Sequence, residues 1–233
     1  MAVSLDSGRT VQTAENGLFD RSRTICFTGH REKSIADYRN NPHLRLHTLA
    51  AVRLMLYRYI DMAVESGYDT FISGLAEGTD LWAADYVLCL KKSNPNIRLI
   101  GVMPYLKHSK YFSPSYRETL KNAELNADLL LSTEMNPDMV YGSAAYTNRS
   151  PDLYRRRNYF MADNSSAVIA FFNTDSFRSG TAQTVSYAKR CGLPVYRFGT
   201  DEVFSAMDSA DVDDIHCIRQ KIMSLPNIIL PCR

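Results

Sequence analysis

The sequence predicts an α/β protein: a Rossmann-like parallel sheet of about six strands with helices on both faces. Two observations lead to this prediction. Short apolar runs alternate with segments of helical period between residues 24 and 198, an order typical of a parallel sheet with crossover helices. The run 167–172 is apolar without a break, as expected of a strand covered on both faces.

The first elements are a strand, a long helix and a second strand. Residues 24–27 form an apolar run that ends at Thr-Gly-His-Arg. Asn41 and Pro42 have the residue types of a helix start, apolar residues then recur at helical spacing, and Gly67 suits the C-terminal end. Residues 70–73 are the second predicted strand.

The middle of the chain repeats this alternation. We expect a helix over residues 81–92, a strand over 97–103 that stops at Pro104, and a helix that Ser113 and Pro114 begin. A strand over 128–132 follows. Residues 134–150 are a polar loop of a length more often found at functional sites.

The last elements again read helix, strand, helix, strand. Pro151 opens a helix that carries three consecutive arginines, and residues 167–172 are the fifth strand. Gly180 and Thr181 start a helix that ends at Gly192, and residues 193–198 are the sixth strand. We therefore predict a loose N-terminal segment (1–20), one Rossmann-like domain (21–200), and an acidic C-terminal extension with a short helix (201–233).

Composition narrows the classes of function. Lys and Arg total 27 and Asp and Glu total 25, a net charge of +2, which does not favour a general nucleic-acid coat. The apolar run 167–172 is far shorter than the roughly 20 residues of a membrane span, and the N-terminus lacks a signal-peptide pattern. Five scattered cysteines without zinc spacing lead us to expect a cytoplasmic protein with no metal site and no cofactor.

The candidate site lies where predicted strands end, because parallel sheets bind ligands at their carboxyl edge. Glycines there allow close approach of a ligand, and helices starting near Thr79 and Thr181 would direct N–H groups at an anion. Arginine adds bidentate recognition of phosphate or carboxylate. The predicted ligand-binding residues are Thr28, Gly29, His30, Arg31, Ser73, Gly74, Leu75, Ala76, Gly78, Thr79, Asp80, Arg157, Asn158, Ser179, Gly180 and Thr181.

Purely structural roles fit many of the same residues. Gly74 and Gly78 suit a turn from strand to helix, and Asp80 suits a helix cap. Tyr141, Tyr146 and Tyr154 have the chemistry to stack on a base, although loop aromatics more often serve packing. Arg157 and Asn158 point more strongly to a site, because the next turn of their helix, 160–162, is apolar.

Four motifs resemble those of the SLOG superfamily, in particular its bacterial YpsA/YspA-like branch. They are Thr-Gly-His-Arg at 28–31, Ser-Gly-Leu-Ala-Glu-Gly-Thr-Asp at 73–80, Arg-Asn with Met-Ala-Asp over 157–163, and Ser-Gly-Thr with Thr184 and Val185 from 179 onwards. The resemblance implies a Rossmann-like domain that binds a nucleotide-like ligand. Members of this superfamily sense nucleotide-derived, including NAD-derived, signals, cleave nucleoside monophosphates, or bind single-stranded DNA, and they commonly pair as homo-oligomers.

The hydrolase resemblance is partial. Arg157 and Met161 match the Arg-Lys-x-x-Met helix of the LOG enzymes, and Gly180 and Thr181 match their Gly-Thr. Their glutamate falls at Thr184 here, and glycosidic cleavage requires a carboxylate. Glu77, Asp80 and Asp175 are the candidates to replace it.

Three functions remain open at this point. The leading hypothesis is a cytoplasmic sensor that binds a small nucleotide-derived ligand. The alternatives are an N-glycosidic hydrolase of nucleoside 5′-monophosphates and a single-stranded DNA-binding protein, the last resembling the DNA-processing protein A family through residues 73–80. A nucleic-acid partner is the least expected because the net charge is small.

Overall fold

The computed structural model describes residues 2–5, 7–36, 42–139, 150–173 and 179–203, together with 214, 216, 217, 220 and 224. Several predictions fall outside these residues: Asp175, most of the polar loop 134–150 with Tyr141 and Tyr146, and most of the extension 201–233. In the described part the strands are β1 (Ala2–Ser4), β2 (Thr10–Thr13), β3 (Thr24–Gly29), β4 (Thr70–Ser73), β5 (Arg98–Met103), β6 (Leu129–Ser132), β7 (Ala167–Phe171) and β8 (Val195–Phe198). The α-helices there are α1 (Glu32–Ala36), α2 (Pro42–Glu65), α3 (Thr79–Ser93), α4 (Pro114–Asn126), α5 (Ser150–Asp163) and α6 (Gly180–Arg190), and Arg21–Arg23 form a short 3-10 helix.

The α/β fold class and the parallel sheet are confirmed. Within the described residues the sheet has eight strands in the order β1-β2-β6-β5-β4-β3-β7-β8, and every pair except β1 and β2 is parallel. The six predicted strands all form; 70–73 has the predicted boundaries, and those of the other five differ by one or two residues.

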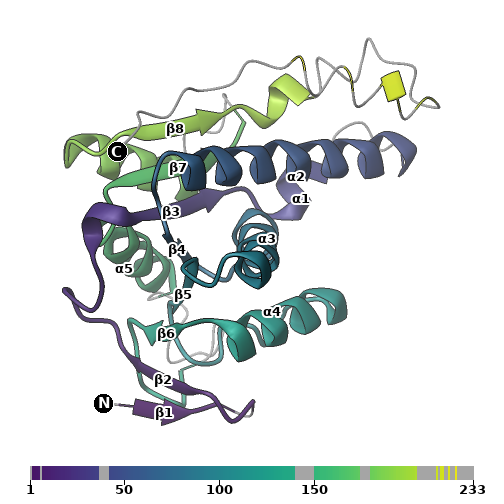
Figure 1. Cartoon of the computed structure of the whole chain (residues 1–233). Coiled ribbons are helices and arrows are strands. Elements are labelled where there is room, and N and C mark those ends of the chain that lie inside the picture. The colour runs from purple at the N-terminus through teal and green to yellow at the C-terminus, as the bar shows by residue number, and fades with distance from the viewer. Residues whose placement is uncertain are drawn as a thin grey trace.

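Helices cover both faces of the sheet, as predicted (Figure 1), with α3 and α4 on one side and α5 on the other. Alternate residues of β3 show how the sequence produces this. Ile25 and Phe27 join the core under α2 and α3, whereas Cys26 joins the core under α5 and α6. Because successive side chains of a strand point to opposite faces, a continuous apolar run supplies both cores.

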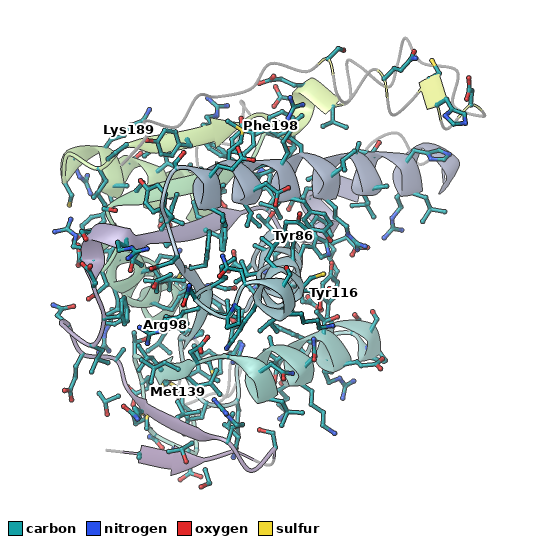
Figure 2. The ribbon with its side chains drawn as sticks, in the orientation of Figure 1. Tyr86, Arg98, Tyr116, Met139, Lys189 and Phe198 are labelled. Atoms are coloured by element: carbon teal, nitrogen blue, oxygen red, sulfur yellow. The ribbon has the colours of Figure 1, made fainter. Side chains whose placement is uncertain are left out.

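Aromatic side chains fill the space between β8 and α2. Phe198, labelled in Figure 2, lies 5.9 Å from Tyr59 of α2 and 5.1 Å from Phe171 of β7, measured between ring centroids. Such pairs stabilise a core beyond the area that they bury. These contacts fix α2 against the half of the sheet that carries the site.

The N-terminal segment is the part of the fold that the prediction of about six strands missed. Strands β1 and β2 pair antiparallel as a hairpin, and β2 pairs in parallel with β6 through Gln12 and Leu131. Arg9 Nη2 also donates to the carbonyl of Ala127 at 2.6 Å. The sequence of β2 carries no strand pattern, because Val11 is the one fully buried residue of its four. The strand forms because the edge of β6 offers it a row of backbone hydrogen-bond partners.

The strand order indicates a ligand-binding position at the carboxyl ends of two central strands of the sheet. The chain runs from β3 outward through β4 and β5 to β6, and then crosses to the other side of β3 to form β7 and β8. The strand order therefore reverses between β3 and β7, which pair up to Gly29 and Phe171. Open α/β sheets bind ligands outside the carboxyl ends of the strands at such a switch point.

Candidate functional site

A pocket of about 290 Å³ lies at the reversal of strand order, and we call it the switch-point pocket. This volume is at the lower end of the range for small-ligand sites. Residues from the loop after β3, from the start of α3, from α5 and from the start of α6 surround it. Its lining residues are Thr28, Gly29, His30, Arg31, Ser34, Ala76, Asp80, Tyr154, Arg157, Asn158, Ser179, Gly180 and Thr181.

Eleven of the sixteen predicted site residues line this pocket. The other five, Ser73, Gly74, Leu75, Gly78 and Thr79, lie in or beside the turn between β4 and α3 without lining it. Ser34 and Tyr154 also line the pocket. Ser34 was not predicted, and Tyr154 is one of the three tyrosines with the chemistry to stack on a base. Tyr154 precedes Arg157 by three positions on α5, a spacing that puts both side chains on one helix face.

The N-terminus of α6 presents unoccupied donors to the pocket. The Ser179 hydroxyl caps the helix by accepting the N–H of Ala182 at 3.1 Å. Among the described residues, the N–H groups of Gly180 and Thr181 have no partner, and a Cβ added to Gly180 would meet no atom within 4 Å. Free N–H groups and the positive end of a helix dipole form an anion site.

The N-terminus of α3 is closed by the loop after β3. Thr79 donates to the carbonyl of His30 twice, through its N–H at 3.3 Å and its Oγ1 at 3.0 Å. Gly78 has a φ of 90°, and a Cβ there would lie 2.6 Å from the backbone nitrogen of Glu32. The prediction that both helices direct free N–H groups at a ligand is therefore wrong for Thr79, and of the two helices α6 alone keeps free N–H groups at the pocket among the described residues.

A buried ion pair forms one wall of the pocket. Arg157 Nη1 lies 3.1 Å from Asp80 Oδ2, and the two side chains are only 5% and 9% exposed. Gly74 makes room for this pair, because a Cβ there would lie 1.2 Å from Arg157 Nη1 and 2.6 Å from Asp80 Oδ2. Burial raises the pKa of the Asp80 carboxyl, and the Arg157 guanidinium opposes that rise.

Two guanidinium groups flank Tyr154. The Cζ atoms of Arg31 and Arg157 lie 5.7 Å and 5.8 Å from the centroid of its ring, within the distance of cation–π attraction. Arg31 is exposed and pairs with no carboxylate among the residues that the structure describes. A guanidinium stacked on an aromatic face keeps the donors at its edge available to an anion.

Comparison with known proteins agrees with this architecture. The model of the YspA SLOG family matches residues 25–201. The chain belongs to this family. It is also 32% identical to the uncharacterized SPbeta prophage-derived protein YoqJ of Bacillus subtilis (strain 168) over 123 residues, covering 53% of this chain and 71% of YoqJ.

Two UPF0398 relatives extend the likeness over more of the chain. A UPF0398 protein of Bacillus velezensis is 21% identical over 192 residues, which cover 81% of this chain and 98% of that protein. The UPF0398 protein YpsA of Bacillus subtilis (strain 168) is 19% identical over 186 residues, with 78% and 94% covered. The N-terminal hairpin precedes the first residue that the family model matches.

Within this SLOG fold, the position of the LOG glutamate is turned away from the pocket. Thr184 is 2% exposed, does not line the pocket, and donates its hydroxyl to the carbonyl of Gly180 at 2.8 Å. Glu77 accepts the N–H of Ser113 at 2.9 Å and also lies outside the lining. Among the described lining residues, Asp80 is the one that carries a carboxylate.

His30 is the one histidine of the described lining. Burial lowers the pKa of its imidazole, which favours the uncharged ring. Its backbone N–H donates to Phe171 at 2.9 Å, and its ring meets the ring of Phe172 edge-on. The described lining thus carries two guanidinium groups, one carboxylate and one helix N-terminus, which favours a negatively charged ligand.

In the part of the chain that the structure describes, no three His, Cys, Asp or Glu side chains gather closely enough to hold a metal ion. None of the helices described combines the length and apolar character needed to cross a membrane.

Proposed function

We propose that this YspA SLOG protein is a cytoplasmic binding protein for a small phosphorylated, nucleotide-derived ligand, NAD-derived molecules included, and that it acts as a sensor. The observation that carries the proposal is the pairing of a free helix N-terminus at Gly180 and Thr181 with the nearly buried Arg157 in one pocket. Backbone N–H groups would hold phosphate, and Asn158 would hydrogen-bond the sugar or the phosphate.

The arrangement favours anion binding over a structural ion pair alone. Asp80 engages Nη1 of Arg157, and no described residue accepts a hydrogen bond from the other amino group, Nη2. The guanidinium therefore retains donors for a ligand. Together with Arg31 and the α6 N-terminus, it gives the pocket more positive than negative charge, as a phosphate ester requires.

A thermal-shift screen tests the proposal first. The panel contains nucleoside mono- and diphosphates, NAD, ADP-ribose, cyclic nucleotides and short single-stranded DNA. A ligand at 100 times its dissociation constant adds about 2.7 kcal/mol to the free energy of unfolding, which raises the melting temperature by roughly 5–10 °C in a chain of this size. No shift with any small anion in the panel would contradict the proposal, and a shift with DNA alone would favour the nucleic-acid alternative.

Calorimetry of two arginine variants then places the ligand. Arg157→Ala should weaken binding by about 2–3 kcal/mol, the contribution of one charge-assisted contact. Arg155→Ala is the matched control, because Arg155 lies on the same helix, is exposed and pairs with Asp152. If both variants bind equally well, Arg157 is not part of the site. The paired variant Asp80→Asn/Arg157→Gln covers the case in which Arg157→Ala does not fold.

Hydrolysis of the N-glycosidic bond is a second candidate, favoured by the position of the Asp80 carboxylate in the pocket lining. It predicts free base on chromatography after incubation with nucleoside 5′-monophosphates. It further predicts that Asp80→Asn abolishes base release. Absence of base from every common nucleotide at high protein concentration would leave binding as the function.

A further inference from the structure

The segment after β5 carries a buried histidine that no part of the proposed binding uses. His108 is 4% exposed, and the rings of Tyr105 and Phe112 meet its imidazole edge-on, with centroids 6.4 Å and 5.5 Å away. Its Nε2 lies 3.4 Å from the carbonyl oxygen of Leu75. Since a carbonyl only accepts, this contact assigns the proton of the neutral ring to Nε2.

Leu75 occupies a conformation that its side chain disfavours. Its φ is 53°, and among the described residues it is the one non-glycine residue in the left-handed region. Such a backbone costs on the order of 1 kcal/mol or more and persists only where surrounding contacts impose it. Two polar contacts do so here: the Leu75 N–H donates to the Ser73 hydroxyl at 3.1 Å, and the Leu75 carbonyl accepts from His108.

The neighbours of Leu75 on both sides shape the buried ion pair. Gly74, immediately before it, leaves the space that the Arg157 guanidinium occupies. Ala76, immediately after it, lines the pocket, and its backbone N–H lowers the pKa of the Asp80 carboxyl. A rotation of the backbone at Leu75 would therefore shift both the space for Arg157 and the backbone group that acts on Asp80.

We propose that His108 is a positioning residue of the switch-point pocket: by holding the Leu75 carbonyl, it keeps the turn 73–76 in the conformation that aims Arg157 at the ligand. The inference rests on the proposed binding of an anion in this pocket. His108 itself lies outside the pocket lining. Its loss should therefore lower the affinity for the ligand without removing any contact to the ligand.

The surroundings keep the imidazole in the neutral, single-donor form that this role needs. The pKa of His108 is lowered to about 4, chiefly by burial and also by the charges of Arg157 from α5 and Arg31 from the loop after β3. The carbonyl groups of Leu75 and Tyr105 act in the opposite direction. At neutral pH the ring therefore donates from Nε2 without placing a second positive charge beside Arg157.

The test compares variants that keep or lose the donor. Glutamine can place an amide N–H near the position of Nε2, whereas leucine keeps the apolar contacts and lacks a donor. Inorganic phosphate is the probe, titrated by calorimetry at pH 7. We expect His108→Gln to bind like the wild type and His108→Leu to bind about tenfold more weakly or worse, as for a displaced charge-assisted contact.

Two further variants keep the result interpretable. Phe112→Leu removes packing from the same segment and should leave the dissociation constant unchanged, because Phe112 makes no polar contact with Leu75. His108→Asn, which is too short to reach the Leu75 carbonyl, replaces His108→Leu if the latter does not fold. Wild-type affinity in His108→Leu or His108→Asn, or equal loss in Phe112→Leu, would overturn the proposal.

A ligand-free measurement separates this inference from the proposed function. The three-bond backbone coupling of Leu75 reports its φ by NMR without any ligand. The left-handed φ should persist in His108→Gln and be lost in His108→Leu. If the wild-type protein binds neither phosphate nor any small anion of the thermal-shift panel, the proposed function fails. The coupling still decides the role of His108, because an unchanged φ in His108→Leu would refute it.

Discussion

Replacing Gly74 with alanine tests whether the absence of a side chain at this position is what gives Arg157 its space. Gly74 does not have a left-handed φ, so alanine causes no backbone strain there. The new Cβ would lie 1.2 Å from Arg157 Nη1 and 2.6 Å from Asp80 Oδ2, distances at which one group must leave. Because the guanidinium is the movable end of a side chain, we expect Arg157 to be displaced and Asp80 to remain buried without its partner.

The cost follows from the burial of the pair. Breaking a buried ion pair while leaving one charge behind destabilises a protein by about 3–5 kcal/mol. At roughly 2–4 °C per kcal/mol for a chain of this length, Gly74→Ala should lower the melting temperature by roughly 6–20 °C. Gly180→Ala is the matched control, since the space around its Cβ is open, and its effect should stay within about 0.5 kcal/mol.

A double-mutant cycle by urea denaturation isolates the cause. If the clash with Arg157 is the whole effect, adding Gly74→Ala to Arg157→Ala should cost less than about 0.5 kcal/mol, because the space is already vacant. Full additivity of the two changes would refute the reasoning. So would a Gly74→Ala crystal structure that retains the Arg157–Asp80 contact at wild-type stability.

Three further predictions concern the turns and caps around the pocket. Gly78→Ala should lower the free energy of unfolding, measured by urea denaturation, by more than about 2 kcal/mol. The position has a φ of 90°, and the new Cβ would lie only 2.6 Å from the Glu32 nitrogen. A smaller loss would mean that the loop after β3 moves easily. Ser179→Ala should cost about 1 kcal/mol through loss of the α6 cap, measured by thermal unfolding, whereas an unchanged melting temperature would show the cap to be dispensable. The free energy of unfolding should also fall as the pH drops from 6.5 to about 4. The pKa of His108 is lowered to about 4 in the folded protein, so the unfolded chain binds more protons than the folded protein in that range. The contribution of His108, about 3 kcal/mol, is present above pH 6.5 and is lost towards pH 4, and urea titrations of His108→Gln should show a correspondingly weaker pH dependence.

Much of the fold could be predicted because the strands are apolar on both faces. The runs 70–73 and 167–172 carry no competing helical signal, and they form β4 and β7. The hairpin of β1 and β2 could not be predicted, because its place is determined by the free edge of β6 rather than by its own pattern. Helix α1 was missed for a similar reason: it has only five residues, and among those whose burial is described Ile35 alone is buried, which gives no periodicity.

The candidate site followed from one rule, that ligands bind where parallel strands end. This rule predicted site residues in the loops after β3, β4 and β7. No site residue was predicted in the loop after β5, where His108 lies. Tyr154 was one of three tyrosines with the chemistry to stack on a base, and its spacing of three residues to Arg157 on a helix is what sets it apart from the other two. Ser34 gave no signal, because it lies on the short helix α1.

The motif 73–80 illustrates how a correct motif can have an unexpected role. Its glycines and its Thr79 suggested a phosphate-binding loop, yet Thr79 is bonded to His30, and Gly74 and Gly78 make room for Arg157 and for the backbone near Glu32. Only Ala76 and Asp80 of this motif line the pocket. In the proposed function the turn would therefore act on a ligand through Arg157, which it accommodates, while the N-terminus of α6 would bind the anion. Substitutions in this motif should consequently lower stability and affinity together, whereas Gly180→Pro, which removes one free N–H at the first position of α6, where proline is tolerated, should lower affinity alone.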